Sequence, residues 1–161
     1  MIVVSNTTPL HYLILLDAAE ILPQLFGQVI VPQAVIHELQ HESAPEKVRQ
    51  WINHLPAWVE VRSAAALDLT LNLGSGENEA ISLAQELHAD RILLDDRKAR
   101  LEAMRRGLAV AGTINILEIA AEQNLLDLPT AFQQLKATTF RVSDALLQEF
   151  LARNAARKAK T

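Results

Sequence analysis

The chain has 161 residues, half of them apolar, with a net charge of −4 and no cysteine. This length can bury a sizeable core in one domain, and the lack of cysteine excludes a disulfide framework and a thiolate metal site. The negative charge argues against a protein that coats nucleic acid by bulk charge, but it allows an enzyme that uses an acidic metal cluster.

Membrane and secretion signals are missing from the sequence. The longest uninterrupted apolar runs, such as Leu13 to Leu16, are far too short to span a bilayer. The first residues, "MIVVSN", have no basic region and no long apolar segment, so no secretory signal is expected. We therefore expect a cytoplasmic protein with no membrane partner.

Apolar runs that end in polar or turn residues alternate with helical patterns along the chain. In order, we expect a strand at 2–5, a helix from Pro9 with a second segment to about Phe26, a strand at 28–32, helices at 33–42 and 48–55, a short or edge strand at 58–63, a helix at 76–88, a strand at 91–94, a helix at 95–107, a strand at 108–112, and helices at 113–126, 130–137 and from Ser143 on. The pattern predicts an α/β fold, a three-layer sandwich with a central parallel sheet and C-terminal helices. We expect a single domain over 1–161, with a core over about 2–127 and a helical extension over 128–161.

Polar residues follow the expected strands, at the edge where sites lie in parallel α/β folds. Asn6 follows the first strand, the helix that carries Glu38 follows the second, Asp95 and Asp96 follow "RILL", and Thr113 follows "LAVAG". Carboxylates that cap separate helices would produce a similar pattern, so both interpretations remain open.

Glu77 is the most unusual of these acids. On a helical wheel it lies on the same face as Ala80, Ile81 and Ala84, whereas Glu79 points the opposite way and is expected to be solvated. A carboxylate on the core face needs a partner, which a divalent cation, a backbone cap or an arginine would supply.

Several carboxylates at one point repel each other unless a cation is bound. Oxygen ligands without thiolates suit Mg²⁺ or Mn²⁺, and such a site activates water and stabilises the leaving oxygen in phosphodiester hydrolysis.

The stretch "AVIHELQH" suggests a different chemistry, because His37, Glu38 and His41 satisfy the H-E-x-x-H pattern of zinc metalloproteases. A third zinc ligand is missing, since the extended motif would need Gly and His where the chain has Ala44 and Lys47. We favour solvated histidines and assign Glu38 to the acidic cluster.

The helix after Asp96 is rich in basic residues. Such a run is typical of a solvated helix face, but Arg97 or Arg100 would also lie close enough to contact a substrate phosphate. The apolar segment around 48–55 would suit a homodimer or partner surface.

Three stretches together resemble the PIN-domain nucleases, in particular the short prokaryotic PIN proteins related to VapC-type toxins. They are "VVSNTTPL", "IVPQAVIHELQ" and "GSGENEAISLAQELHADRILLDDRKARLEAMRRGLAVAGT", and the resemblance covers about residues 2–127. It implies a parallel α/β fold and a metal-dependent ribonuclease that uses Mg²⁺ or Mn²⁺. It also implies RNA as the substrate and, in many members, an antitoxin partner.

The resemblance also assigns site residues. The catalytic positions fall on Asn6, Glu38, Glu77 and Asp95, and the metal ligands are Glu38, Glu77, Asp95 and Asp96. Apart from the resemblance, the basic helix adds Arg97 and Arg100, so the residues expected to hold or contact substrate are Thr7, Thr8, Arg97, Arg100 and Thr113. Asn6 departs from the family, which has aspartate there. An amide brings no charge and cannot act as a base, so an inactive nucleic-acid or protein-binding module is the alternative to an enzyme.

Overall fold

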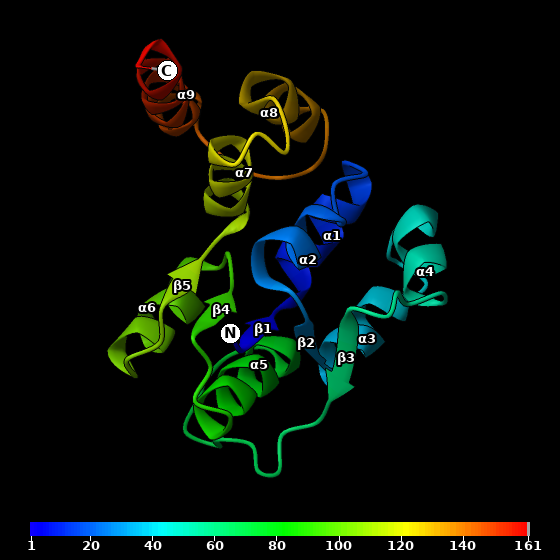
Figure 1. Ribbon diagram of the computed structural model, residues 1–161. Helices are drawn as coiled ribbons and strands as arrows, with labels where there is room; N and C mark the ends of the chain where they lie inside the picture. The colour runs from blue at the N-terminus through cyan, green and yellow to red at the C-terminus, as the bar shows by residue number, and fades with distance from the viewer. Residues whose placement is uncertain (161) are drawn as a thin grey trace. The chain divides into compact units, whose positions relative to one another are not determined.

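The computed structural model describes residues 1–160, which fold into strands and helices in alternation (Figure 1). The elements are β1 (Val3–Ser5), α1 (Thr7–Leu15), α2 (Ile21–Phe26), β2 (Val29–Pro32), α3 (Gln33–Gln40), α4 (Glu46–Ile52), β3 (Val59–Arg62), α5 (Ser75–Glu86), β4 (Arg91–Leu93), α6 (Arg97–Arg105), β5 (Val110–Ala111), α7 (Thr113–Glu122), α8 (Leu128–Lys136) and α9 (Asp144–Ala159).

The strands form one parallel sheet in the order β3-β2-β1-β4-β5. Val4 on the central strand β1 is in register with Ile30 on β2 and with Ile92 on β4. The ends of β1 and β4 are therefore neighbours in the middle of the carboxyl edge. The predicted α/β fold with a central parallel sheet flanked by helices is confirmed.

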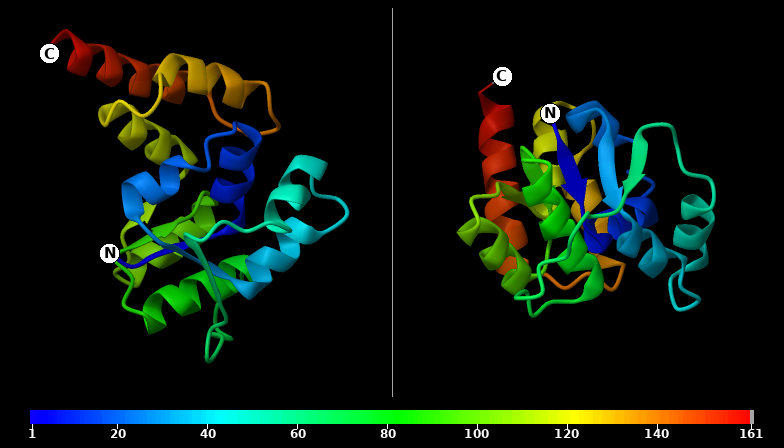
Figure 2. Two further views of the ribbon diagram at one scale, coloured as in Figure 1. Left: turned by 45° about the vertical axis from the view of Figure 1, so that its right-hand side comes forward. Right: turned by 90° about the horizontal axis from the view of Figure 1, so that it is seen from below.

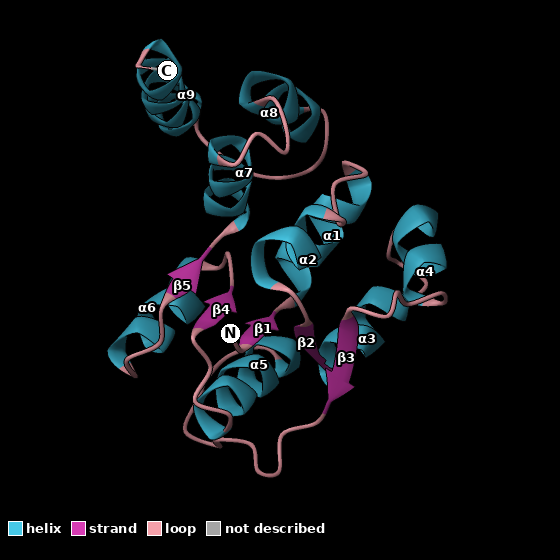
Figure 3. Cartoon of the chain, in the orientation of Figure 1, coloured by secondary structure: helices cyan, strands magenta, loops and turns pink. Residues whose placement is uncertain are grey.

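The described chain divides into two compact units, which Figure 3 shows by their secondary structure. Met1–Thr113 holds the whole sheet and α1 to α6, and the second unit begins at Ile114 and holds nearly all of α7 with α8 and α9. The single domain over 1–161 with an extension from residue 128 stays a prediction.

The core of the first unit lies on the two faces of the sheet. The strands are short and almost fully apolar, as expected when helices cover both faces. Figure 2 shows α5 on one face and α2 on the other. Ala80, Ile81 and Ala84 of α5 are fully buried against Ile92 and Leu94 in one apolar cluster. The small alanines allow α5 to approach the sheet closely, which brings its N-terminus to the carboxyl edge.

In the second unit, α8 and α9 contact each other through Phe132 and Phe150, whose rings meet edge to face at 6.4 Å. The Arg153 guanidinium lies 4.2 Å from the centre of the Phe150 ring and donates to Glu118 of α7 at 3.0 Å. Among residues 1–160, no helix combines the length and the apolar character needed to cross a bilayer.

Candidate functional site

Asn6 lies at the centre of the carboxyl edge, directly after β1. Its backbone N–H donates to the carbonyl of Leu93 on β4 at 2.9 Å, and the residue is only 3% exposed. Its side-chain oxygen, Oδ1, is buried and accepts no hydrogen bond from any described residue. Because a buried oxygen without a donor costs free energy, this atom is available for a cation or a bound donor.

Glu38 reaches this edge from α3, the helix that follows β2. Its carboxylate accepts a hydrogen bond from the Thr7 hydroxyl, at the start of α1, and one from the Gly76 N–H at 3.0 Å. The side chain therefore joins the first turns of α1 and α5 and is held on both oxygens. Thr7 has the role of a hydroxyl that fixes a carboxylate.

Gly76 gives Glu38 the space for this contact. A Cβ atom at position 76 would lie 2.5 Å from Glu38 Oε1 and 2.9 Å from its Cδ. A glycine is thus required at this close approach. The sequence contained the signal, because glycine weakens a helix, and its presence in a first turn therefore indicates a close contact.

Glu77 follows Gly76 in the first turn of α5 and is half-buried, as predicted. Its Oε1 accepts from the Gly74 N–H at 3.3 Å, so a backbone cap supplies part of the partner that this acid needs. Burial raises the pKa of the Glu77 carboxyl, and the negative charges of Asp96 and Glu38 raise it further, while the Gly74 hydrogen bond and Lys98 oppose the shift. Glu77 is therefore crowded by like charge.

Asp95 follows β4, and its side chain is directed toward Thr113, which follows β5. Its Oδ1 accepts from the Thr113 N–H at 2.9 Å and its Oδ2 from the Thr113 hydroxyl at 2.5 Å. Burial raises the pKa of the Asp95 carboxyl, and the two Thr113 hydrogen bonds and the charge of Arg100 partly oppose that. Thr113 is fully buried, so its described role is to position Asp95.

Asp96 is exposed and caps α6, accepting from the Ala99 N–H at 3.0 Å. The negative charges of Asp96 and Glu38 both raise the pKa of Glu77. The negative charges of Glu38 and Asp96 therefore act on Glu77, and Asp95 is held separately by Thr113.

The donor set suits a hard divalent cation, because it combines carboxylates that repel each other with the unsatisfied buried oxygen of Asn6. Within residues 1–160, no three or more Asp, Glu or His side chains are grouped so as to hold an ion by themselves. The Asn6 oxygen and water would therefore complete the ligand set, which is common for Mg²⁺ since it keeps several waters.

The other residues predicted to contact substrate differ in their surroundings. Arg97 is exposed and has no hydrogen-bond or ion-pair partner among the described residues, whereas Arg100 is half-buried and acts on Asp95. Thr8 is half-buried in the first turn of α1.

The prediction that Glu79 is solvated is wrong. Its Oε1 accepts from the Ala34 N–H at 2.9 Å, in the first turn of α3, and its Oε2 from the Ala64 N–H at 3.4 Å. Glu79 instead caps α3 from a neighbouring helix and so helps to orient the helix that carries Glu38.

The geometry of the H-E-x-x-H motif differs from that of a zinc protease. The helix α3 ends at Gln40, and His41 lies beyond it in an extended conformation. The Nδ1 atom of His41 accepts from the Ser43 N–H at 3.1 Å. The motif needs both histidines on one helical face, and that condition is not met here.

Together these features define an α/β protein with an acidic site at the carboxyl edge of a parallel sheet. The family model described as "DUF3368: PIN domain" matches residues 2–156, so the chain belongs to the PIN-domain family. PIN domains are generally nucleases and typically use divalent metal ions.

Among solved structures, the chain is similar to a PilT N-terminus domain protein from the hyperthermophilic archaeon Sulfolobus solfataricus P2. The two share 15% sequence identity and a TM-score of 0.49 over 72% of this chain and 90% of that one. No curated protein matches the chain.

Proposed function

We propose that this protein is a ribonuclease that hydrolyses RNA phosphodiester bonds with Mg²⁺ or Mn²⁺. Membership of the PIN-domain family supports nuclease activity in general. The observation that carries the proposal is the unsatisfied buried oxygen of Asn6 at the carboxyl edge, and the like charge that Asp96 and Glu38 exert on Glu77 supports it. A divalent cation would relieve both the repulsion and the missing hydrogen bond.

Each acid has an anchor that fixes its orientation before substrate arrives. Thr7 and the Gly76 N–H hold Glu38, the Gly74 N–H holds Glu77, and Thr113 holds Asp95. When bound, Mg²⁺ or Mn²⁺ supplies positive charge that favours hydroxide over water and stabilises a leaving oxygen. We assign Asn6 the role of a neutral oxygen ligand, because an amide cannot take up a proton at neutral pH.

The role of a toxin in a toxin–antitoxin pair is also part of the proposal. It rests on the resemblance of the sequence to short prokaryotic PIN proteins, and it implies RNA and a cognate antitoxin as partners, with a homodimer as a further arrangement. Because the net charge is −4, we expect RNA to be bound by a local basic surface near the acids.

The direct test is RNA cleavage by metal-free protein to which Mg²⁺ or Mn²⁺ is returned. We expect cleavage by wild type and its loss in Glu77→Gln. The matched control is Glu86→Gln in the same helix, where the carboxylate accepts from the Ala65 N–H away from the site. The double variant His37→Ala with His41→Ala should still cleave RNA, and no peptide should be hydrolysed by any of the proteins.

A binding module without catalysis is the second candidate, and Asn6 in place of an acid is the observation that favours it. RNA that is bound by wild type but stays intact at saturating Mn²⁺ would establish this candidate and refute the enzyme.

A further inference from the structure

Beside the acids, the first unit contains an open hollow of about 350 Å³. It lies between α6 and the segment that joins β3 to α5. It is lined by Thr70, Leu71, Asn72, Leu73, Lys98, Glu102 and Arg105.

The hollow borders the acidic site at two points. Leu73 directly precedes Gly74, whose N–H holds Glu77. Lys98 lies in the first turn of α6, two residues after Asp96, and its positive charge acts on Glu77. The hollow therefore lies close to Glu77, where the proposed function places a phosphate of the RNA.

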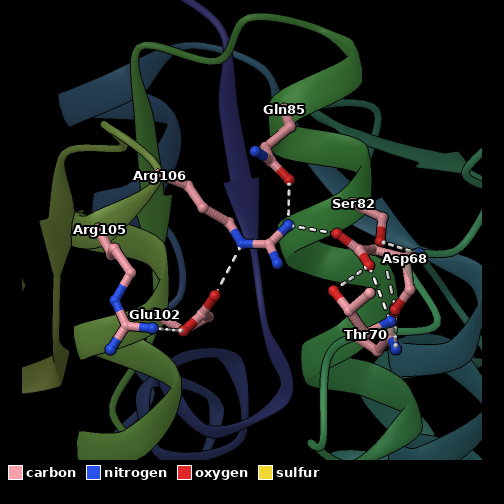
Figure 4. A network of polar contacts seen from close by, with 8 residues as sticks. Asp68, Thr70, Ser82, Gln85, Glu102, Arg105 and Arg106 are labelled. Atoms are coloured by element: carbon pink, nitrogen blue, oxygen red, sulfur yellow. Dashed lines mark hydrogen bonds and ion pairs between the residues drawn. The ribbon is translucent and has the colours of Figure 1, made fainter.

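A polar network fixes the wall of the hollow (Figure 4). The Arg106 guanidinium of the α6 C-cap donates to Asp68 at 2.5 Å, and the same nitrogen donates to Gln85 of α5 at 2.8 Å. Asp68 in turn accepts from the N–H of Thr70 at 2.9 Å and from its hydroxyl at 2.5 Å. Residues 68–70 are thus held between α5 and α6, and the hollow is formed in advance of any ligand.

Lys98 fixes the next part of the wall, because its Nζ donates to the Asn72 carbonyl at 2.9 Å. An ammonium group has three N–H donors, so this single bond leaves donors for an anion. Arg105 is a second cation here, since its side chain is 76% exposed and forms an ion pair with Glu102 at 3.3 Å.

The lining combines two chemistries. Leu73, which is only partly buried, supplies apolar surface, and Lys98 and Arg105 supply positive charge beside it, with Glu102 paired to Arg105. A nucleotide has the complementary pair, a flat base with apolar faces and an anionic phosphate. The volume lies at the lower end of the range of about 300–1,000 Å³ that is typical of small-ligand pockets.

We propose that this hollow binds one nucleotide of the RNA strand next to the bond that is cleaved, with its base on Leu73 and its phosphate at Lys98 and Arg105. This inference rests on the proposed ribonuclease function, because the bound strand is the substrate of that function. It adds a substrate-binding subsite to the acidic site.

The test combines a variant that fills the hollow with one that removes a phosphate contact. Asn72→Trp places a large ring in the hollow from an exposed position, and its control is Asn53→Trp at the exposed C-cap of α4. Lys98→Met removes the cation, and its control is Arg91→Gln at the first residue of β4, the opposite edge of the sheet. Melting curves confirm that each variant is folded, and Arg105→Met replaces Lys98→Met if the latter unfolds.

The readouts are the Kd for a single-stranded RNA oligonucleotide in EDTA and the KM for its cleavage in Mn²⁺. We expect Asn72→Trp to raise both by about fivefold or more, since base contacts of this kind are worth about 1–3 kcal/mol. Lys98→Met should lower the slope of log Kd against log salt concentration by about 0.7, one phosphate contact, and Lys98→Arg should restore it.

Two outcomes overturn the inference, and they are distinguishable. If wild type binds and cleaves RNA while the hollow variants behave like their controls, the subsite is refuted and the ribonuclease stands. If wild type neither binds nor cleaves RNA, the subsite fails together with the proposed function.

Discussion

The carboxylate of Glu38 occupies the space in which a side chain at Gly76 would lie. Oε1 of Glu38 accepts from the Gly76 N–H at 3.0 Å, and a Cβ on Gly76 would be only 2.5 Å from that same oxygen. The position of an acid on α3 therefore depends on the absence of a side chain on α5.

We expect Gly76→Ala to impair RNA cleavage by about tenfold or more without unfolding the protein, because a misplacement of about 1 Å at a site can cost about 100-fold in rate. Alanine has the better helix propensity, and the atom that must move is the end of a flexible side chain. The measurement is the cleavage rate at saturating Mn²⁺, together with the melting temperature.

The matched control for this change is Gly74→Ala. A Cβ there would lie 3.4 Å from Glu77 Oε1, which is an ordinary contact, and the backbone φ of −63° is accessible to alanine. Equal rates for the two alanine variants would show that the Glu38–Gly76 contact is irrelevant to the reaction.

Glu77→Gln should stabilise the protein at neutral pH although it removes activity. Burial and the charges of Asp96 and Glu38 raise the pKa of Glu77, so its ionised form opposes folding above that pKa. The opposition disappears as the pH falls toward the unfolded pKa of about 4.3. We expect the variant to melt about 2 °C higher than wild type at pH 7 and at the same temperature near pH 4.

Glu86→Gln tests whether that gain is specific. The Glu86 carboxylate accepts from the Ala65 N–H at 3.2 and 3.1 Å, so a substitution there should bring no stabilisation. A gain of equal size in both variants, or a loss in Glu77→Gln at pH 7, would contradict the account of like-charge crowding.

The sheet and the helices were predictable because burial on both faces leaves a local signal. Strands such as Val29–Pro32 are short apolar runs, and this one ends at a proline. The helix expected at 113–126 ends at Glu122 instead, because Asn124 adopts a positive φ of 59° and the chain turns there. Nothing in the apolar periodicity marks that turn.

The site was less predictable because its partners come from distant segments. A helical wheel describes only the faces of one helix, so Glu79 looked solvated, although Ala34 of α3 supplies its donor across 45 residues. Asp95 and Asp96 are adjacent and chemically equal in sequence. Only the fold shows that Asp95 turns to Thr113 while Asp96 acts on Glu77.

Asp68, which holds the wall of the hollow, should make a contribution to the stability of the fold that depends on pH. Hydrogen bonds from Thr70 and Arg106 lower the pKa of Asp68 to about 2. A depressed pKa stabilises the fold above the unfolded value of about 3.9, and that contribution is lost as the pH falls through the folded value. Urea unfolding should show wild type more stable than Asp68→Asn at pH 7, with the gap closing between about pH 4 and pH 2.

An exposed ion pair provides the comparison for Asp68. Asp144 pairs with Lys136 at 2.5 Å, but the Asp144 side chain is 76% exposed, so Asp144→Asn should change stability little at any of these pH values. A wild-type advantage over Asp68→Asn that stays constant from pH 7 to pH 2 would refute the role assigned to the Asp68 carboxylate.

At position 6 this chain has an amide, Asn6, where its resemblance to the PIN-domain nucleases implies an acid. A carboxylate at this 3% exposed position would be a buried charge without a described donor. We therefore expect Asn6→Asp to lower the free energy of unfolding in EDTA by about 1–3 kcal/mol. In Mn²⁺ the same charge attracts the cation, so the variant should gain more thermal stability from metal than wild type does.

Activity should follow the metal affinity. Asn6→Asp is expected to raise the cleavage rate at limiting Mg²⁺, with a smaller gain at saturating Mn²⁺, which binds oxygen sites more tightly. Asp95→Asn, which removes a second charge, should abolish cleavage. The decisive measurement is the melting temperature of wild type and Asn6→Asp across a titration of Mn²⁺. If the two curves rise in parallel, the Asn6 oxygen does not face the cation, and the ligand set must be built from Glu38, Glu77 and Asp96 without it.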